Sequence, residues 1–354
     1  MPKQKPWFRT WFAGVTAGVV FCAGLMAFIA NSLLVKQQLA FTEPPEHLMG
    51  WAGPEKAKEA WSELKGKFPK FKIVGEVKSS EGANVKLWKH TIAVTGSHLP
   101  TIRQEIGDCV SQGSKNGVEY LLCGQIVKGE LQSFEPVAQY YHYAYGRMII
   151  GKGQIRGPDG SVGSWQADGV REGGVLPMSF GGGMPEYNGK VSSQWAVRKP
   201  EAKYIAEGKR HTVVTTAMVT TYEEVRDAIA NGYPVVICSN VGFAMQPRVD
   251  GGKHFGSPQG TWNHCMVLVG IDDTVKAPSF AGNRSGKKGA AYCLNSWGPD
   301  AHGSPADDAP PGGFWISRDV IVRMVSQEDS FAYSGLNGFL AAPPEWDFGF
   351  DLAL

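Results

Sequence analysis

The chain has no strong charge of either sign and few cysteines for its length. Its 354 residues include 35 basic and 33 acidic ones, so the net charge is 35 − 33 = +2. This balance argues against a general nucleic-acid binder, because such proteins usually carry a basic excess on a face or tail. Six cysteines in so long a chain do not form a disulfide scaffold.

Several kinds of motif are also missing. We find no internal repeat, no low-complexity tract and no glycine motif of the kind that binds phosphate. The glycine-rich pieces at 181–183 and 286–289 are expected to be loops. The histidines show no paired spacing typical of metal ligands, so the sequence predicts no metal and no cofactor. The histidines considered are His142, His211, His254 and His302.

What the chain does have is enough apolar side chains for a sizeable core. Hydrophobic residues make up 43% and charged residues 19%, which excludes wholesale disorder. The 45 glycines and 22 prolines indicate many turns and long loops. The length fits two domains, or one large domain with extensions.

A run without charge follows a basic N-terminus. Residues 11–34, WFAGVTAGVVFCAGLMAFIANSLL, are 24 residues with no charged side chain, and about 20 helical residues cross a bilayer core. A cleaved signal peptide would have a shorter apolar region of roughly 7–15 residues, and Phe28 fits its cleavage pattern poorly. We therefore predict a transmembrane anchor, with residues 1–10 in the cytoplasm and the rest outside. Gly14 and Gly18 form one GxxxG pattern, a weak indication of helix dimerisation.

Residues 35–90 are expected to form a stalk or linker. Pro44, Pro45 and Pro54 interrupt any continuation of the anchor helix. From Glu55 the sequence EKAKEAWSELKGKF has the periodicity of a short amphipathic helix. It could be the remnant of an inhibitory prosegment, but we favour a helix that simply packs on its domain.

Beyond the stalk we expect one globular domain at 91–330 and a C-terminal tail at 331–354. Capping signals and periodicity predict helices at 108–122, 137–150, 164–172 and 222–230. Strands are predicted at 234–238, 265–271, 291–294 and 313–317. Helices come first and strands later, which is typical of an α+β fold and not of alternating βαβ units.

Three short segments carry residues with chemistry, in the order Cys, His, Asn. Cys109 stands at the start of a predicted helix, where the helix dipole favours the thiolate, which is the nucleophile. His264 opens a strand, and Asn295 follows another one. A histidine can take the thiol proton, and an asparagine oxygen can hold the imidazole in the required tautomer.

These segments resemble the papain-like cysteine peptidases. The resemblance covers roughly residues 95–325 and rests on several motifs in the family's order, of which NSWG is the most specific. The motifs are GDC at 107–109, EGGVLP at 172–177, TYEEVRDAIANGYPVVI at 221–237, NH at 263–264 with VLVGID after it, NSWG at 295–298 and GGFWIS at 312–317. The resemblance implies an α+β papain-like fold with a helical subdomain and a β-barrel-like subdomain.

The resemblance also implies roles for single residues. Cys109 matches the nucleophile, His264 the general base and acid, and Asn295 the residue that orients the imidazole. Trp297 matches the indole that covers the Asn–His hydrogen bond. Gln104 matches the glutamine of the oxyanion hole. The implied partner is a peptide or protein substrate.

The sequence departs from the family pattern beside the nucleophile. The family usually places its glutamine six residues before the cysteine, whereas Gln104 is five before it and Arg103 has the sixth place. Val110 stands where the family usually has tryptophan. Asp108 adds a negative charge that opposes a low thiol pKa. We expect Gln104, and not Arg103, to be the oxyanion donor.

Three functions fit these observations. The first is a membrane-anchored cysteine peptidase that hydrolyses peptide bonds through an acyl-enzyme thioester. The second is a papain-fold structural or binding protein, such as a surface or virion component, with little turnover. The third is a cell-wall amidase or transpeptidase that uses the same triad.

The remaining candidate residues have structural explanations. Residues 276–288 are expected to be a solvated basic hairpin loop. Four further cysteines lie in apolar helix or strand positions and are expected to be buried thiols. They are Cys123, Cys238, Cys265 and Cys293.

Overall fold

The computed structural model describes residues 43–69, 71 and 79–339. Contacts divide the chain into two units, Met1–Phe41 and Thr42–Leu354, and the described residues all belong to the second. Within the described residues, no helix has the length and apolar character needed to cross a membrane. The predicted anchor at 11–34, with Gly14 and Gly18, lies outside the described residues.

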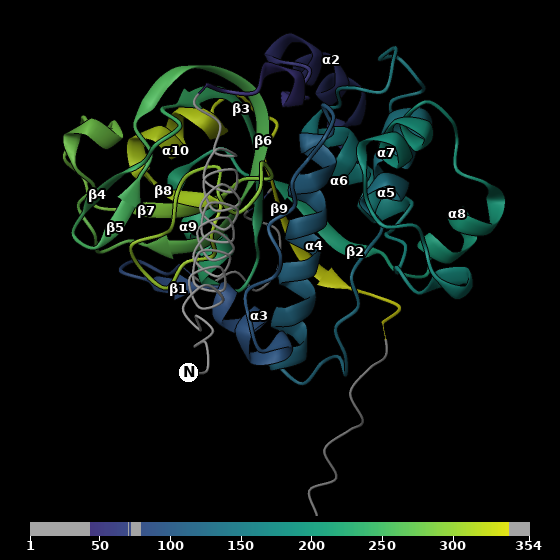
Figure 1. Ribbon diagram of the computed structural model, residues 1–354, viewed down its shortest axis with the longest axis horizontal. Helices are drawn as coiled ribbons and strands as arrows, with labels where there is room; N and C mark the ends of the chain where they lie inside the picture. Colours follow the sequence, from purple (N-terminus) through teal and green to yellow (C-terminus); the bar gives the residue numbers. More distant parts are fainter. Residues whose placement is uncertain (1–42, 70, 72–78, 340–354) are drawn as a thin grey trace, which may run out of the picture. The chain divides into compact units, whose positions relative to one another are not determined.

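One half of the domain is helical and is built around α4. This helix, Cys109–Val127, begins at the candidate nucleophile and is buried along most of its length. Figure 1 shows α5, α7 and α8 on one side of α4 and most of the sheet on the other. The other elements of this half are α5 (Gln139–Tyr145), the π-helix η4 (Gly146–Ile150), α6 (Gly163–Glu172), η5 (Phe180–Gly182), α7 (Gly189–Ala196) and α8 (Ala202–Gly208).

The other half is a mostly antiparallel sheet in the order β2-β9-β3-β6-β7-β8-β5-β4, with β1 paired to β6. Its strands are β1 (Asn84–Lys86), β2 (Val213–Met218), β3 (Val235–Phe243), β4 (Arg248–Asp250), β5 (Lys253–Phe255), β6 (Pro258–Asp272), β7 (Ala290–Leu294), β8 (Gly313–Ser317) and β9 (Phe331–Leu336). Between and before the strands lie α3 (Trp88–Thr95), α9 (Tyr222–Ala230), η6 (Ser279–Ala281) and α10 (Arg318–Val325).

The register of β6 and β7 explains why two of the candidate residues meet. Val267 on β6 is paired with Leu294 on β7 in an antiparallel ladder. His264 precedes this pair on β6, and Asn295 comes directly after β7. Because antiparallel strands run in opposite directions, both residues lie at the same end of the β6–β7 ladder, where β7 stops and β6 continues.

Most of the predicted elements are present, with shifted ends. Helix α4 continues to Val127, and the helix predicted at 137–150 is divided into α5 and the π-helix η4. Strands β3 and β6 are longer than predicted. The elements that the sequence does not predict are α3, α7, α8, α10, β1, β2, β4, β5 and β9. Each has eight residues or fewer, so its sequence carries too few repeats for a clear period.

Two expectations need correction. Strand β9 lies inside the predicted tail at 331–354 and pairs with β2 and β3, because its apolar side chains complete the sheet. Residues 276–288 are the loop between the antiparallel neighbours β6 and β7, as expected, and their basic part at 284–288 is exposed, although Ala281 is buried and the amides of Arg284 and Ser285 donate to Asp319 at the start of α10. Part of the predicted stalk is integrated into the domain.

That integrated segment begins with η1 (Glu46–Leu48) and continues with α2 (Pro54–Leu64) and η2 (Lys65–Lys67). The helix predicted from Glu55 packs on the domain, as expected, and buries its apolar face against the core that contains Trp165 of α6. The side chains of that face are Ala57, Ala60 and Leu64. The burial of apolar surface explains why this segment does not stand free as a stalk.

Candidate active site

Cys109 is the first residue of α4, and its side chain is completely buried. One turn later, Gly113 faces the strand that carries His264. A Cβ atom on Gly113 would lie 3.1 Å from the Met266 carbonyl oxygen and 3.4 Å from Cys265 Sγ. The glycine therefore lets the first turn of α4 pack closely on β6, at Cys265 and Met266, the two residues that follow His264 in the chain.

His264 and Asn295 form a buried hydrogen bond. The distance from His264 Nε2 to Asn295 Oδ1 is 2.7 Å, and the exposed fractions of the two residues are 1% and 0%. Since Oδ1 can only accept, Nε2 carries the proton and Nδ1 is the basic nitrogen. Among the described residues, Nδ1 has no hydrogen-bond partner. It is therefore free to take a thiol proton.

Asn295 is held on its other side by a second histidine. Its amide nitrogen lies 2.9 Å from Nε2 of His302, and Nδ1 of His302 lies 3.0 Å from the Met245 carbonyl oxygen. The carbonyl can only accept, so Nδ1 of His302 carries the proton and Nε2 accepts from the amide. This arrangement fixes which end of the Asn295 amide faces His264. Sequence reasoning considered His302 only as a metal ligand, and no motif marked it.

Aromatic rings enclose the His264–Asn295 bond. The ring centroid of Trp297 lies 4.5 Å from that of His264, and Trp297 is completely buried. Trp262, also buried, lies 4.8 Å from Trp297 and forms a stacked pair with His302 at 6.2 Å. The rings keep water from the hydrogen bond, which strengthens it electrostatically.

The NSWG segment fixes the orientation of the Gln104 side chain. The Ser296 hydroxyl donates to Gln104 Oε1 at 2.7 Å, and the Gln104 backbone amide donates to the Ser296 carbonyl at 2.8 Å. The side-chain amide therefore faces the other way, where Nε2 donates to the carbonyl oxygens of Leu48 at 2.6 Å and Ile106 at 2.7 Å. Gln104 is buried, and its Nε2 is directed at carbonyl oxygens.

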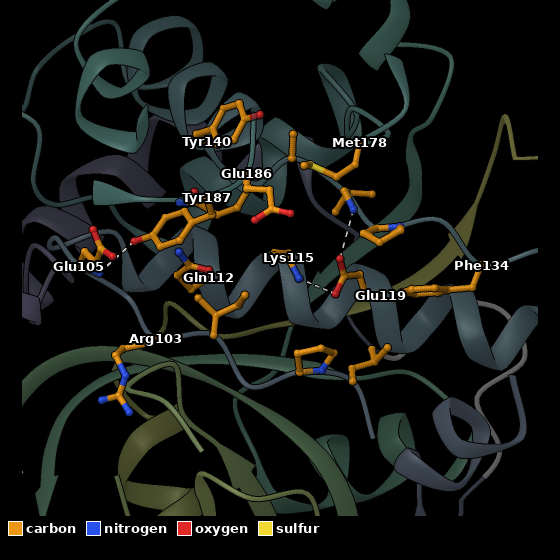
Figure 2. Close-up of a pocket in the computed structure, with 17 residues that line it drawn as sticks. Arg103, Glu105, Gln112, Lys115, Glu119, Phe134, Tyr140, Met178, Glu186 and Tyr187 are labelled. Atoms are coloured by element: carbon orange, nitrogen blue, oxygen red, sulfur yellow. Dashed lines mark hydrogen bonds and ion pairs between the residues drawn. The ribbon is translucent and has the colours of Figure 1, made fainter. Parts of the chain in front are cut away.

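Arg103 faces elsewhere. Its guanidinium forms an ion pair with Asp300 and lies 3.5 Å from the Trp297 carbonyl oxygen. Figure 2 shows its side chain pointing away from the other residues of a pocket of about 610 Å³ that α4 lines with Gln112, Lys115 and Glu119. None of the residues Cys109, His264 or Asn295 lines that pocket.

A segment of the chain itself covers the nucleophile. We call residues 48–52 the strap. The Gly50 amide donates to Cys109 Sγ at 3.3 Å, and the Gly50 carbonyl accepts from the Ser161 amide at 2.8 Å. The Trp51 amide donates to the Asn263 carbonyl at 3.0 Å, and the Ala52 amide to the Ser161 carbonyl at 2.9 Å. The strap thus presents an N–H group, and not a carbonyl carbon, to the thiol.

Close packing of glycines allows the strap to lie so deep. A Cβ atom on Gly50 would lie only 1.9 Å from the Gly107 carbonyl oxygen, so no other residue fits there without movement of the backbone. Leu48 and Trp51 on either side are each 2% exposed. A pocket of about 540 Å³ remains beside the strap, lined by Met49, Phe243, Met245 and Trp262 among others.

Burial holds the candidate catalytic pair in its neutral form. It raises the pKa of the Cys109 thiol well above its usual value, while the amide of Gly50 acts in the opposite direction. It lowers the pKa of His264 to about 4, although the hydrogen bond to Asn295 favours the charged form. The expected lowering of the thiol pKa at the helix start is therefore outweighed while the strap excludes water. With the strap in place, burial disfavours a thiolate–imidazolium pair.

Asp108 lies in a polar cage on the helical side of the nucleophile. Its carboxylate accepts from Ser192 at 2.7 Å, Gln139 at 3.0 Å and Tyr187 at 3.3 Å. Burial raises the pKa of Asp108 to about 7 despite these donors. When charged, the carboxylate raises the pKa of Cys109, as expected from the sequence, but its own high pKa limits that charge at neutral pH.

The other thiols are buried, as expected. Cys123, Cys238, Cys265 and Cys293 each have an exposed fraction of 0%. Among the described residues all cysteines are free. Cys265 and Cys238 are directly paired across β6 and β3, on the side that packs against Cys109.

Comparison with known proteins reveals similarity in structure but not in sequence. Neither a protein-family model nor a curated protein sequence matches the chain. Procathepsin B S9 from Trypanosoma congolense superimposes with a TM-score of 0.52 over 82% of this chain and 87% of that one, at 11% identity. The chain has the papain-like cysteine-protease fold.

Two further solved structures are similar with lower scores. Xylellain, a cysteine protease from Xylella fastidiosa, has a TM-score of 0.49 at 15% identity and covers 73% of this chain and 88% of its own. The bromelain protease from Ananas comosus, in complex with the E64 inhibitor, has a TM-score of 0.43 at 16% identity and covers 71% and 98%. The papain-like fold predicted from the motifs is confirmed by the superposition on procathepsin B S9, with mixed helices and strands.

Proposed function

We propose that the chain is a cysteine peptidase in which Cys109, His264 and Asn295 act together. The observation that carries the proposal is the buried hydrogen bond between His264 of β6 and Asn295 just after β7. It is joined by a buried cysteine at the first position of α4, a helix whose first turn packs on β6 at Cys265 and Met266. The papain-like fold supports the same reaction class. Gln104, with its donor directed at a carbonyl oxygen of the strap, supports a position for an oxyanion.

The reaction follows from these groups. His264 Nδ1 takes the proton of the Cys109 thiol, and Sγ attacks the substrate carbonyl carbon. The Gln104 amide and the Cys109 backbone N–H stabilise the oxyanion. The C–N bond breaks as His264 gives its proton to the leaving amine, which leaves a thioester on Cys109. Water, deprotonated by His264, then releases the acid and restores the thiol.

In the form described here the peptidase is latent. The strap donates a hydrogen bond from the Gly50 amide to the Cys109 thiol and accepts one from the Gln104 side chain at the Leu48 carbonyl. Burial keeps the thiol protonated. Turnover therefore requires the strap to be displaced or cleaved. The amphipathic helix α2 follows the strap directly, which supports the prosegment interpretation of this region as well as its packing role.

The covered thiol also favours a second candidate, the papain-fold binding protein with little turnover. The two candidates differ in what happens when the strap leaves. A thiol-directed epoxide labels Cys109 of a peptidase, and a peptide library is cleaved. Labelling without cleavage of any peptide supports the binding protein, and cleavage of cell-wall fragments alone supports an amidase or transpeptidase.

We propose further that residues 11–34 anchor the protein in a membrane, with the peptidase domain on the extracytoplasmic side. The uncharged run of 24 residues after Lys3, Lys5 and Arg9 supports this. Carbonate extraction should leave the intact chain in the membrane pellet. Release of a shortened soluble chain would show that the segment is a cleaved signal peptide.

A further inference from the structure

Two of the buried thiols face each other across neighbouring strands. Cys238 of β3 is directly paired with Cys265 of β6 in an antiparallel ladder. The Cys238 amide donates to Ser330 Oγ at 3.2 Å, and the Cys238 carbonyl accepts from the same hydroxyl at 3.5 Å. Because the N–H and C=O of one strand residue point to the same side, both groups of Cys238 point away from β6. Cys238 and Cys265 are therefore a pair without backbone hydrogen bonds between them.

Such a pair has the spacing that a disulfide requires. The Cα atoms of partners without mutual backbone hydrogen bonds lie about 4.5 Å apart, and their side chains are close together on one face. Disulfides join residues whose Cα atoms are about 4.4–6.8 Å apart. Burial, and after it a side-chain hydrogen bond with Cys265, raises the pKa of the Cys238 thiol, so the two thiols are in contact. The native register thus holds both sulfur atoms where a disulfide can close.

The thiol of Cys293 lies near this pair but lacks the arrangement. Cys293 of β7 is paired with Leu268, which is three residues beyond Cys265 on β6. Successive side chains of a strand point to opposite faces, so Cys293 and Cys265 lie on opposite faces of the sheet. Cys293 Sγ accordingly lies 3.6 Å from Met266 Sδ, on the face away from Cys265. Cys293 is therefore a matched control for the pair.

The nucleophile is the competing partner for Cys265. Gly113 of α4 packs on the Cys265 thiol, because a Cβ atom there would lie 3.4 Å from Sγ. Cys109 begins the same helix one turn earlier, about 5–6 Å along its axis. The ladder holds Cys238 directly opposite Cys265, whereas Cys109 belongs to another layer and its thiol accepts from the Gly50 amide. Register therefore favours Cys238 over Cys109 as the partner of Cys265.

We propose that Cys238 and Cys265 are an oxidation site at which a cross-strand disulfide closes beside the start of α4 and leaves Cys109 free. The bond removes the thiol that packs on the first turn of α4 as a possible partner of the nucleophile. This benefit rests on the proposed peptidase function, which needs a free Cys109. The bond itself depends only on the register of β3 and β6.

The chemistry is thiol–disulfide exchange with a disulfide oxidant such as oxidised glutathione. One protein thiolate attacks a sulfur of the oxidant, forms a mixed disulfide and releases one glutathione thiolate. The second protein thiolate attacks the protein sulfur of the mixed disulfide and releases the other. Two electrons pass from the protein to the oxidant, and the two protons of the protein thiols end on the two glutathione thiols.

Burial sets the stage at which the bond closes. Cys238 and Cys265 are each 0% exposed, and buried thiols of raised pKa are inert, so exchange takes place while the chain folds. The folded domain then protects the bond from reductants. The proposed extracytoplasmic location supplies the oxidant, because disulfides form and persist in oxidising compartments.

The first test maps the disulfides of the full chain. It is synthesised in a cell-free mixture that contains lipid nanodiscs, once with reduced glutathione alone and once with oxidised glutathione added. Free thiols are blocked with N-ethylmaleimide in denaturant, and tryptic peptides are analysed without reduction. Trypsin cuts at Arg248 and Lys253, so a bond between the two cysteines joins peptides 227–248 and 254–276.

We expect this linkage to dominate the oxidised sample. Maleimide labelling of Cys238 and Cys265 should be lower than in the reduced sample by about tenfold or more, while Cys109 and Cys293 stay labelled. Full labelling of Cys238 and Cys265 in both samples would overturn the proposal. A dominant linkage between Cys109 and Cys265 would overturn it as well.

Matched variants show whether Cys238 is the partner. Both are made in a chain that also carries Cys109→Ala, so that the nucleophile cannot replace Cys238. Cys238→Ala should restore maleimide labelling of Cys265 in the oxidised sample, whereas Cys293→Ala should leave Cys265 protected. Protection of Cys265 that persists in Cys238→Ala would show that another group is the partner.

Stability separates a native bond from one formed in a misfolded chain. The bond closes a loop over residues 239–264, so the oxidised chain should melt roughly 5–10 °C above the reduced chain. A lower melting temperature of the oxidised chain would contradict the proposal, because the bond would then distort the sheet. Neither measurement uses turnover. A chain that cleaves no peptide can therefore still confirm the bond, and an active peptidase whose Cys238 and Cys265 stay labelled refutes it.

Discussion

The amide nitrogen of Asn295 lies 2.9 Å from Nε2 of His302, so the residue that faces His264 is itself positioned by a second imidazole. Burial lowers the pKa of His302 to about 4, which keeps it neutral and keeps Nε2 an acceptor. If the amide turned over, its nitrogen would face Nε2–H of His264, and two donors would meet. His302 therefore prevents an orientation of Asn295 that would disable the pair.

The first prediction concerns His302. The measurement uses protein whose strap is displaced by Gly50→Ala, called strap-displaced protein below. In it, His302→Ala should lower kcat by roughly 10–100-fold with little change in KM. This loss is smaller than the ~10⁴-fold loss that is typical when the group that directly holds a catalytic histidine is changed. His302→Gln should recover part of the loss, because its side-chain oxygen can accept from Asn295. His142→Gln is a matched control, since His142 is also buried, with a pKa lowered by burial to about 4. Equal losses of kcat in the two Gln variants would mean that His302 acts only through stability.

The second prediction concerns Asn295. Asn295→Ala should lower kcat more than His302→Ala does, because it removes the acceptor for His264 directly. Melting temperature is measured alongside. If stability collapses together with activity, Asn295 is a structural residue and its assigned role is wrong.

The third prediction ranks the two candidate oxyanion donors. Gln104→Ala should lower kcat about 100–1000-fold, the usual effect of removing one such donor. Arg103→Ala should lower it less than about tenfold, because its guanidinium pairs with Asp300. Both rates are measured on one peptide, with the alkylation rate of Cys109 as a check on the nucleophile. The reverse order would show that the residue at the family's usual spacing is the donor.

The fourth prediction concerns pH. Because the pKa of Asp108 is about 7, its carboxylate becomes charged as the pH rises through that value, and the charge then raises the pKa of Cys109. Asp108→Asn in strap-displaced protein should therefore shift the alkylation profile of Cys109 to lower pH. Asp319→Asn should leave the profile unchanged, because Asp319 lies at the start of α10 against Arg284 and Ser285 and is not among the groups that act on the pKa of Cys109. A shift to higher pH in Asp108→Asn would show that hydrogen bonding, and not charge, dominates its effect.

The sequence was sufficient for the papain-like fold because several local motifs occur in the family's order. GDC lies at the start of α4, NH lies within β6 and NSWG follows β7, and the structure joins His264 and Asn295 of these motifs by a hydrogen bond. His302 could not be predicted in the same way. It lies outside the motifs, and its position depends on contacts with Asn295 and Met245 that only the folded chain forms, so no spacing along the chain reveals it.

The strap was missed for a different reason. The prolines on either side of it, Pro44, Pro45 and Pro54, indicated a break after the anchor, and its five residues are too few to show a period. What fixes its position is a glycine that fits against the Gly107 carbonyl and a tryptophan that reaches Asp329. Such fit between surfaces depends on the folded domain and has no signature in the segment itself. The thiol pKa expected from the helix start was wrong for the same reason, since it ignored burial under the strap.

The most direct test of a latent cysteine peptidase is the effect of one methyl group on the strap. Gly50→Ala places a Cβ atom where the Gly107 carbonyl lies, whereas Gly66→Ala adds its methyl group to open space. Cleavage of a peptide library is compared in the unmodified chain, in these two variants and in Gly50→Ala with Cys109→Ala. We predict cleavage by Gly50→Ala well above that of the unmodified chain and of Gly66→Ala, and none once Cys109 is also replaced. If Gly50→Ala folds and exposes Cys109 to alkylation but cleaves no peptide, the chain is not a latent peptidase.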